Sequence, residues 1–170
     1  YSGQIVARLR TNTINSLEDD VRVSKRVFVP SRRLRGFESG KVGPKDGTQY
    51  IGGNYATALN LNSTIPNIFF ENEKLDFNIF LDIANVWEVD YNSNLDSNKF
   101  RSSTGVAVNW FSAIGPLSFS YAIPISSEPS DKKNLLDLEL EHLFNNEKKN
   151  FNIYLIKYSY IKFQSRNCLY

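Results

Sequence analysis

The sequence is poor in the residues that build disulfide, metal and catalytic sites. Its 170 residues include one cysteine, Cys168, one histidine, His142, and no methionine. A single cysteine excludes a disulfide framework or a cysteine-rich zinc site, and a single histidine leaves any histidine-based site incomplete. We therefore expect no catalytic residues, no metal site and no cofactor. Since methionine is missing even at position 1, we also expect the chain to begin inside a longer gene product.

Excess charge of one sign is also missing, and so are long apolar runs. The 20 basic and 18 acidic residues leave a net charge of +2. This balance argues against a nucleic-acid partner, despite the basic cluster of Arg32, Arg33 and Arg35. No apolar run approaches the roughly 18 residues that a membrane-spanning helix requires. A membrane helix is therefore excluded, whereas a membrane barrel, whose strands alternate, is not.

Alternation of apolar and polar residues with a period of two, typical of β-strands, is present. It recurs in five stretches, at residues 4–12, 54–63, 76–87, 104–111 and 117–125. In the third stretch Ile79 and Leu81 share one face, and Phe80 and Asp82 share the other. Each stretch is about ten residues long, the length of a tilted strand that crosses a bilayer. The sequence thus predicts an all-β fold of antiparallel strands.

The connections between these stretches alternate in length. Residues 13–53 and 88–103 form long connections, whereas residues 66–75 and 113–116 form short ones. Such alternation is typical of an outer-membrane barrel, which has long loops outside and short turns on the periplasmic side. A soluble antiparallel sandwich also has alternating strands, so periodicity alone does not separate the two folds.

Four ordered blocks of sequence resemble a known family. They are residues 34–54, which contain the triplet Arg35-Gly36-Phe37, and residues 80–87, 112–117 and 120–124. In this order and at this spacing they resemble the C-terminal part of the barrel in the BamA-like outer-membrane protein assembly factors, within the bacterial surface antigen superfamily. The resemblance implies a transmembrane barrel of about 16 strands, of which this chain holds about five. We assign residues 1–131 to that C-terminal part of the barrel.

The resemblance also implies a site. In the family the arginine of the triplet lies on a long loop that folds into the barrel lumen and docks on acidic residues of the wall. By the motif match that arginine is Arg35, and the wall contacts are Asp82 and Phe80. The alternation agrees, because Phe80 and Asp82 lie opposite the apolar stripe. Family members usually carry a second wall acid where this chain has Asn62, which can accept a hydrogen bond but carries no charge.

The resemblance implies a function without bond chemistry. We expect a fragment of an insertase, located in the outer membrane of a Gram-negative bacterium, that folds and inserts β-barrel proteins. Its expected partners are the outer-membrane lipid bilayer, unfolded outer-membrane proteins and accessory assembly lipoproteins. Two alternatives stay open: a two-partner-type polypeptide secretion pore of the same superfamily, and a soluble β-sandwich binding module.

The pattern changes after Asp131. Leucines among acidic residues at 135–144 favour an amphipathic helix or an irregular tail. Back-translation of residues 136–144 with AT-rich codons gives, in another frame, Arg-Phe-Arg-Ile-Gly-Thr-Ser-Phe and a stop codon, an alternating strand that ends in phenylalanine. Residues 131–134 can be encoded by a run of adenines, where reading slips. We therefore predict that residues 132–170 are a frameshifted, non-native tail; the alternative is a genuine helical extension.

Overall fold

The chain is described here by a computed structural model, which covers residues 3–16, 20–65, 75–96, 98–112, 115–140 and 160–169. Over these residues the chain forms strands and three short 3-10 helices: η1 (Val23–Lys25), η2 (Ser31–Arg33) and η3 (Ser93–Leu95). No helix within these ranges is long and apolar enough to cross a membrane. Most of the two predicted short connections, residues 66–74 and 113–114, lies outside the described residues, and so does His142.

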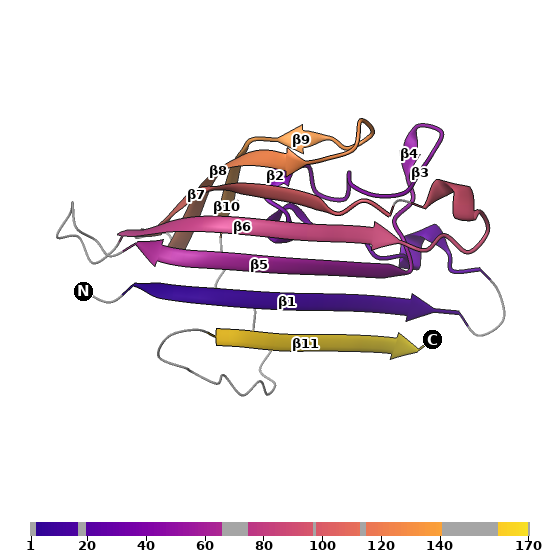
Figure 1. Cartoon of the computed structure of the whole chain (residues 1–170), viewed down its shortest axis with the longest axis horizontal. Helices are drawn as coiled ribbons and strands as arrows, with labels where there is room; N and C mark the ends of the chain where they lie inside the picture. Colours follow the sequence, from indigo (N-terminus) through magenta and orange to yellow (C-terminus); the bar gives the residue numbers. More distant parts are fainter. Residues whose placement is uncertain are drawn as a thin grey trace.

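Five long strands form the centre of one sheet (Figure 1). They are β1 (Gln4–Asn15), β5 (Tyr55–Ile65), β6 (Leu75–Trp87), β7 (Arg101–Ser112) and β8 (Gly115–Ser126). Consecutive members of this set pair antiparallel: β1 with β5, β5 with β6, β6 with β7, and β7 with β8. The five strands predicted from the alternation are therefore confirmed, and their ends lie within three residues of the predicted bounds.

The alternation gives the sheet two different faces, because successive side chains of a strand point to opposite sides. On β6, Ile79 is 48% exposed, whereas its neighbour Phe80 is 2% exposed and Asp82 is fully buried. The exposed face carries large apolar side chains, among them Ile5, Ile79, Val106, Phe119, Tyr121, Ile123 and Ile125. The other, inner face carries small and polar residues, and part of it is covered by the chain itself.

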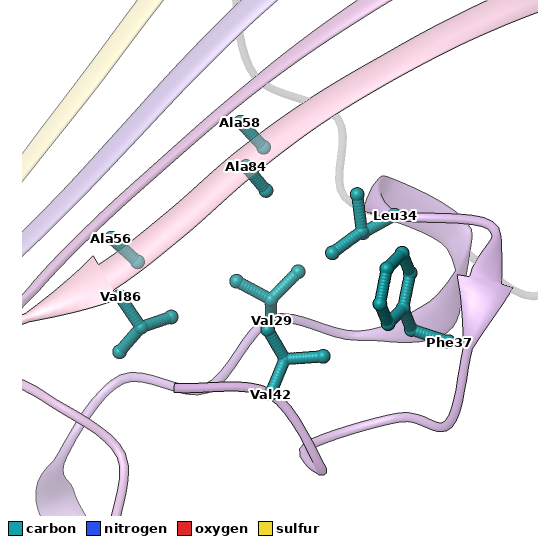
Figure 2. Close-up of a cluster of buried hydrophobic side chains, with 8 residues drawn as sticks. All are labelled: Val29, Leu34, Phe37, Val42, Ala56, Ala58, Ala84 and Val86. Atoms are coloured by element: carbon teal, nitrogen blue, oxygen red, sulfur yellow. The ribbon is translucent and has the colours of Figure 1, made fainter. Parts of the chain in front are cut away.

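Residues 20–54, the long connection between β1 and β5, cover the inner face and are called the lumen loop below. The loop contains η1, η2 and three two-residue strands, β2 (Gly36–Phe37), β3 (Lys45–Asp46) and β4 (Gln49–Tyr50). Figure 2 shows its apolar side chains pointing toward small residues of β5 and β6. This buried cluster consists of Val29, Leu34, Phe37 and Val42 from the loop and Ala56, Ala58, Ala84 and Val86 from the wall. The alanines leave the space that the loop fills.

The C-terminal part of the chain adds strands at both ends of the sheet, whose order is β10-β8-β7-β6-β5-β1-β11. β9 (Lys133–Asn134) pairs with β2, β10 (Leu136–Leu140) pairs antiparallel with β8, and β11 (Tyr160–Leu169) pairs parallel with β1. At these residues the irregular or helical conformation predicted for the tail is wrong, and the rest of the predicted helical stretch, residues 141–144, lies outside the described residues. Leucines at 136, 138 and 140 alternate with acids, and the edge of β8 offers backbone groups to pair with.

Candidate functional site

Arg35 and Asp82 make the central contact beneath the lumen loop. Arg35 lies between η2 and β2, and its Nε donates a hydrogen bond of 2.7 Å to Oδ2 of Asp82 on β6. Its Nη2 donates to Oδ1 of the same carboxylate at 2.8 Å, and its backbone N–H donates to Oδ2 at 3.2 Å. The Asp82 side chain is fully buried and that of Arg35 is 15% exposed. The contact is a two-pronged, largely desolvated ion pair, which is strong and directional.

Asn60, on the neighbouring strand β5, completes the surroundings of the carboxylate. Its Nδ2 donates to Oδ1 of Asp82 at 2.7 Å and to the backbone carbonyl of Arg33 at 2.9 Å. A buried carboxylate costs much free energy unless its oxygens are paired and hydrogen-bonded. Arg35 and Asn60 together supply the ion pair and the hydrogen bonds that this carboxylate needs. Asn60 also adds a second link between β5 and the loop, through the carbonyl of Arg33.

The guanidinium of Arg35 makes a hydrogen bond along its edge and packs its flat face on an aromatic ring. Nη2 donates to Oδ1 of Asn62 at 2.9 Å, and the guanidinium carbon lies 3.5 Å from the centre of the Phe80 ring. A cation over an aromatic ring is attracted by the negative face of the ring. These contacts fix the plane of the arginine as well as its charge.

Gly36 and Phe37 complete the triplet. Gly36 has a φ of +89°, which favours glycine, and turns the chain after Arg35. Phe37 is buried in the apolar cluster of Figure 2. The backbone carbonyl of Arg35 accepts a hydrogen bond from the Ser103 hydroxyl on β7. The arginine therefore contacts the wall, the glycine permits the turn and the phenylalanine fills the core.

The structure brings the six residues singled out in the sequence into one place. They are Arg35, Gly36 and Phe37 of the loop, Asn62 of β5, and Phe80 and Asp82 of β6. Two contributors were missed, Asn60 and Ser103. Asn60 lies two residues before Asn62 and so shares its face of β5, which the alternation could have revealed. Ser103 carried no signal of its own in the sequence.

A buried arginine cluster outside this site was also missed. Arg101, the first residue of β7, is fully buried and contacts Asp131 and Glu128 in the connector between β8 and β10. No motif or regular spacing links these three residues in the sequence. Their proximity depends on the β7–β8 pairing and on the turn that follows β8.

The residues of the site bind the lumen loop to the sheet. In the part of the chain that the structure describes, no group of three or more histidine, cysteine or acidic residues could hold a metal ion. The side chains around Arg35 are a carboxylate, two amides and an aromatic ring, which bind and orient an arginine. The arrangement holds the lumen loop on β5 and β6.

Comparison with known proteins identifies the fold. The sequence profile of the Omp85 superfamily domain matches residues 2–154. The outer membrane protein assembly factor BamA of Neisseria meningitidis serogroup B is 28% identical over 65% of this chain and 17% of its own length. The crystal structure of BamA from Haemophilus ducreyi lacking POTRA domains 1–3 aligns with a TM-score of 0.55 and 32% identity. That alignment covers 62% of this chain and 24% of the other.

These similarities agree with the sheet and with its two faces. The profile match spans most of the chain, including all five long antiparallel strands and the lumen loop. It also rules out the soluble β-sandwich that alternation alone had left open. The chain belongs to the Omp85 superfamily, and its sheet is part of the β-barrel of a Gram-negative outer-membrane protein.

Proposed function

We propose that this chain is part of an insertase that folds β-barrel proteins and inserts them into the outer membrane. Its similarity to two BamA proteins, one of them named an outer membrane protein assembly factor, supports this function. That similarity, over the same strands and loop, is the single observation that carries the proposal, and the Arg35–Asp82 ion pair, formed by the residues that match the family's motif, agrees with it. The chain spans 17% of the length of the Neisseria relative, so the activity is that of a longer protein.

The proposed mechanism is strand addition, with no covalent bond made or broken. Unpaired backbone groups at a sheet edge can template an incoming strand. In the insertase, the seam between the first and last strands of the barrel opens and offers such an edge to an unfolded client. Within the described residues, 136–140 pair with residues 117–121 of β8, which supports a C-terminal edge that accepts an added strand.

The lumen loop supports the wall from inside while that edge is in use. Arg35 and Asp82 attach the loop to β6, and Gly36 lies against Ala122 of β8, the strand next to the edge. In this proposal the ion pair keeps the wall in shape, and its loss weakens assembly.

The proposed partners follow from the faces of the sheet and from the relatives. Large apolar side chains on the exposed face, such as Val106 and Ile123, suit the acyl chains of the outer-membrane lipid bilayer. Unfolded outer-membrane proteins are the proposed clients, and accessory assembly lipoproteins are proposed to bind the complete protein.

A hybrid barrel tests the function. Residues 3–131 replace the matching segment of the Neisseria assembly factor, and cells depleted of their own factor receive the hybrid. We expect outer-membrane protein levels to recover, and we expect the hybrid carrying Arg35→Ala to restore less. A hybrid that folds in the outer membrane but restores no client levels would contradict the insertase and favour the secretion pore of the same superfamily. Heat-dependent gel mobility reports the folding of each hybrid.

We also propose that residues 132–170 are a frameshifted tail. A slip in the adenine-rich codons for residues 131–134 would restore an alternating strand ending in phenylalanine. The edge of β8 is where the last strand of an antiparallel barrel belongs, and the restored frame would supply an alternating strand for it. Resequencing the DNA across codons 131–147 decides it: one base more or fewer supports the proposal, and an intact frame contradicts it.

A further inference from the structure

Arg101 forms a second buried ion cluster, apart from the Arg35 site. Its Nε and Nη2 donate to the two oxygens of Asp131 at 3.0 and 3.2 Å, and Nη2 also donates to Oε2 of Glu128 at 2.5 Å. Its Nη1 donates to Oδ1 of Asn85 at 2.9 Å and to the carbonyl of Lys99 at 2.8 Å. The side chains of Arg101 and Asp131 are both fully buried.

The cluster joins three parts of the chain. Asn85 lies on β6, Arg101 begins β7, and Glu128 and Asp131 lie in the connector of residues 127–132 after β8. Oδ2 of Asp131 also accepts the backbone N–H of Glu128 at 2.7 Å, which closes the connector into a turn. A buried ion pair contributes little net stability but is costly to break, so it selects one geometry. Here it selects the position of Asp131 relative to β6 and β7.

The strand that follows the connector cannot select its own register. Residues 136–140 read Leu-Asp-Leu-Glu-Leu, so a shift by two residues places leucine on leucine positions and acid on acid positions. Leu136 and Leu138 are exposed on the outer face, where little protein distinguishes one leucine from another. Strand register is set by the apolar pattern and by the turn before it. Since this pattern repeats, the information must come from the turn.

We propose that Arg101 is the positioning residue that sets the register of the strand following Asp131 on β8. Asp131 precedes Leu136 by five positions, and an extended chain spans at most about 3.3–3.6 Å per residue. Fixing Asp131 therefore limits which residue can reach Tyr121, the partner of Leu136.

The other contacts of the connector do not depend on residue identity. The N–H of Lys132 donates to the carbonyl of Lys41, and the N–H of Glu38 donates to the carbonyl of Lys132. Such backbone hydrogen bonds could form equally well after the strand shifts by two residues. The guanidinium of Arg101, in contrast, binds a carboxylate, which the chain provides at Asp131. All the anchoring side chains precede residue 132, outside the tail proposed above to be frameshifted. The inference concerns the printed sequence, whose residues 136–140 carry the repeating pattern. The inference does not depend on the proposed insertase activity.

Disulfide trapping between β8 and β10 measures the register. The N–H of Ala122 donates to the carbonyl of its partner Leu135, so these two residues form a hydrogen-bonded pair. Because hydrogen-bonded and non-hydrogen-bonded pairs alternate along an antiparallel ladder, Phe119 and Leu138, three positions further along, form a non-hydrogen-bonded pair. The Cβ atoms of such a pair are close enough for a disulfide. In a Cys168→Ser background, Phe119→Cys with Leu138→Cys reports the native register. Phe119→Cys with Leu136→Cys or with Leu140→Cys reports a slip of two residues in either direction.

In the full chain refolded in detergent micelles, we expect the native pair to dominate. With Arg101→Met its share should fall to about a third, because three registers become equivalent once the turn no longer distinguishes them. Arg101→Lys keeps the charge without the fork and should restore only part of the preference. Asp131→Asn, which keeps the shape of the side chain, should lower the preference even if Arg101→Met does not fold.

Two controls separate positioning from general loss of structure. Arg22→Met makes the same chemical change at an exposed position and should leave the register unchanged. The pair Ser63→Cys with Ile79→Cys, partners on β5 and β6, should cross-link equally well in every variant. The proposal would be overturned by native-register trapping that persists in both Arg101→Met and Asp131→Asn. It would equally be overturned if the parent chain showed no preference among the three registers.

Discussion

Gly36 of the lumen loop lies against Ala122 of β8 so closely that a side chain at position 36 would be crowded. A Cβ atom at position 36 would lie 3.1 Å from the Cβ of Ala122 and 3.4 Å from the Cβ of Ser103. The φ of +89° at Gly36 adds a second reason, since residues with a side chain rarely adopt it. The loop therefore reaches β7 and β8 through its backbone, in addition to the Arg35 contact on β6.

Gly36→Ala is expected to loosen the loop. The added methyl group must push the loop away from Ala122, and the backbone strain adds a cost of about 1–3 kcal/mol. Trypsin cleavage within residues 20–54 of the refolded protein should become faster. Gly47→Ala is the matched control, because Gly47 also has a positive φ, +55°, but nothing within 4 Å of its position for a Cβ. Equal cleavage of the two variants would contradict the close approach.

Arg35→Ala is expected to release the loop from the wall. The change leaves Asp82 buried with Asn60 as its remaining side-chain donor, and breaking a buried pair from one side costs about 3–5 kcal/mol. Urea-dependent protection of the loop against trypsin measures the loss. Arg32→Ala serves as the control, since Arg32 is an exposed residue of η2. The contact would have no structural role if both variants lost protection at the same urea concentration.

Removing both charges should cost less than removing one. In Arg35→Met with Asp82→Leu no buried charge is left without a partner, so part of the lost stability should return. The same urea series, run on both single variants and the double variant, yields the coupling free energy of the pair. Strictly additive effects would mean that Arg35 and Asp82 do not act as a unit.

Asn62→Asp is expected to hold the loop more firmly. Nη2 of Arg35 already donates to Oδ1 of Asn62, and a hydrogen bond to a charged acceptor is roughly twice as strong as one to a neutral acceptor. Repulsion from Asp82 limits the gain to about 0.5–1 kcal/mol. The urea midpoint of loop protection should rise, while Asn62→Ala should lower it. A lower midpoint for Asn62→Asp would show that the repulsion dominates.

Loop stability should depend on pH through Tyr50. Its hydroxyl donates to the carbonyl of Ser130, which joins the lumen loop to the connector after β8. Burial, followed by the carboxylates of Asp131 and Glu38, raises the pKa of Tyr50 above its usual value. The contribution of Tyr50 is therefore complete below about pH 10 and is lost as the pH rises through its raised pKa. The difference in urea midpoint between wild type and Tyr50→Phe should shrink in this range; a constant difference would contradict the contact.

The strands could be predicted from sequence because each alternates over about ten residues, and burial on one face enforces that pattern. The same reasoning failed at residues 136–140, part of a leucine-rich stretch whose spacings fit a helix as well as a strand. At residues 136–140 the available edge of β8 decides between them, and an edge is a property of the assembled sheet.

The candidate site was predictable only in part. Arg35, Asp82, Phe80 and Asn62 came from the resemblance to a family together with the side of the strand on which each residue lies. Arg101 could not be found in this way, because its partners lie 27 and 30 residues away in a turn without a motif. Nor does the sequence reveal why β5 and β6 carry alanines on the inner face. That reason is the loop packed against them.

The apolar underside of the lumen loop limits how the barrel wall can deform. Lifting the loop would expose Val29, Leu34, Phe37 and Val42 to water, at about 1.5–3 kcal/mol for each side chain. It would also strip Asp82 of its cation. The loop is thus packed firmly against the wall, and we expect β5, β6 and the loop to move together as one rigid unit. We therefore expect the barrel to deform at the strands on either side of β5 and β6.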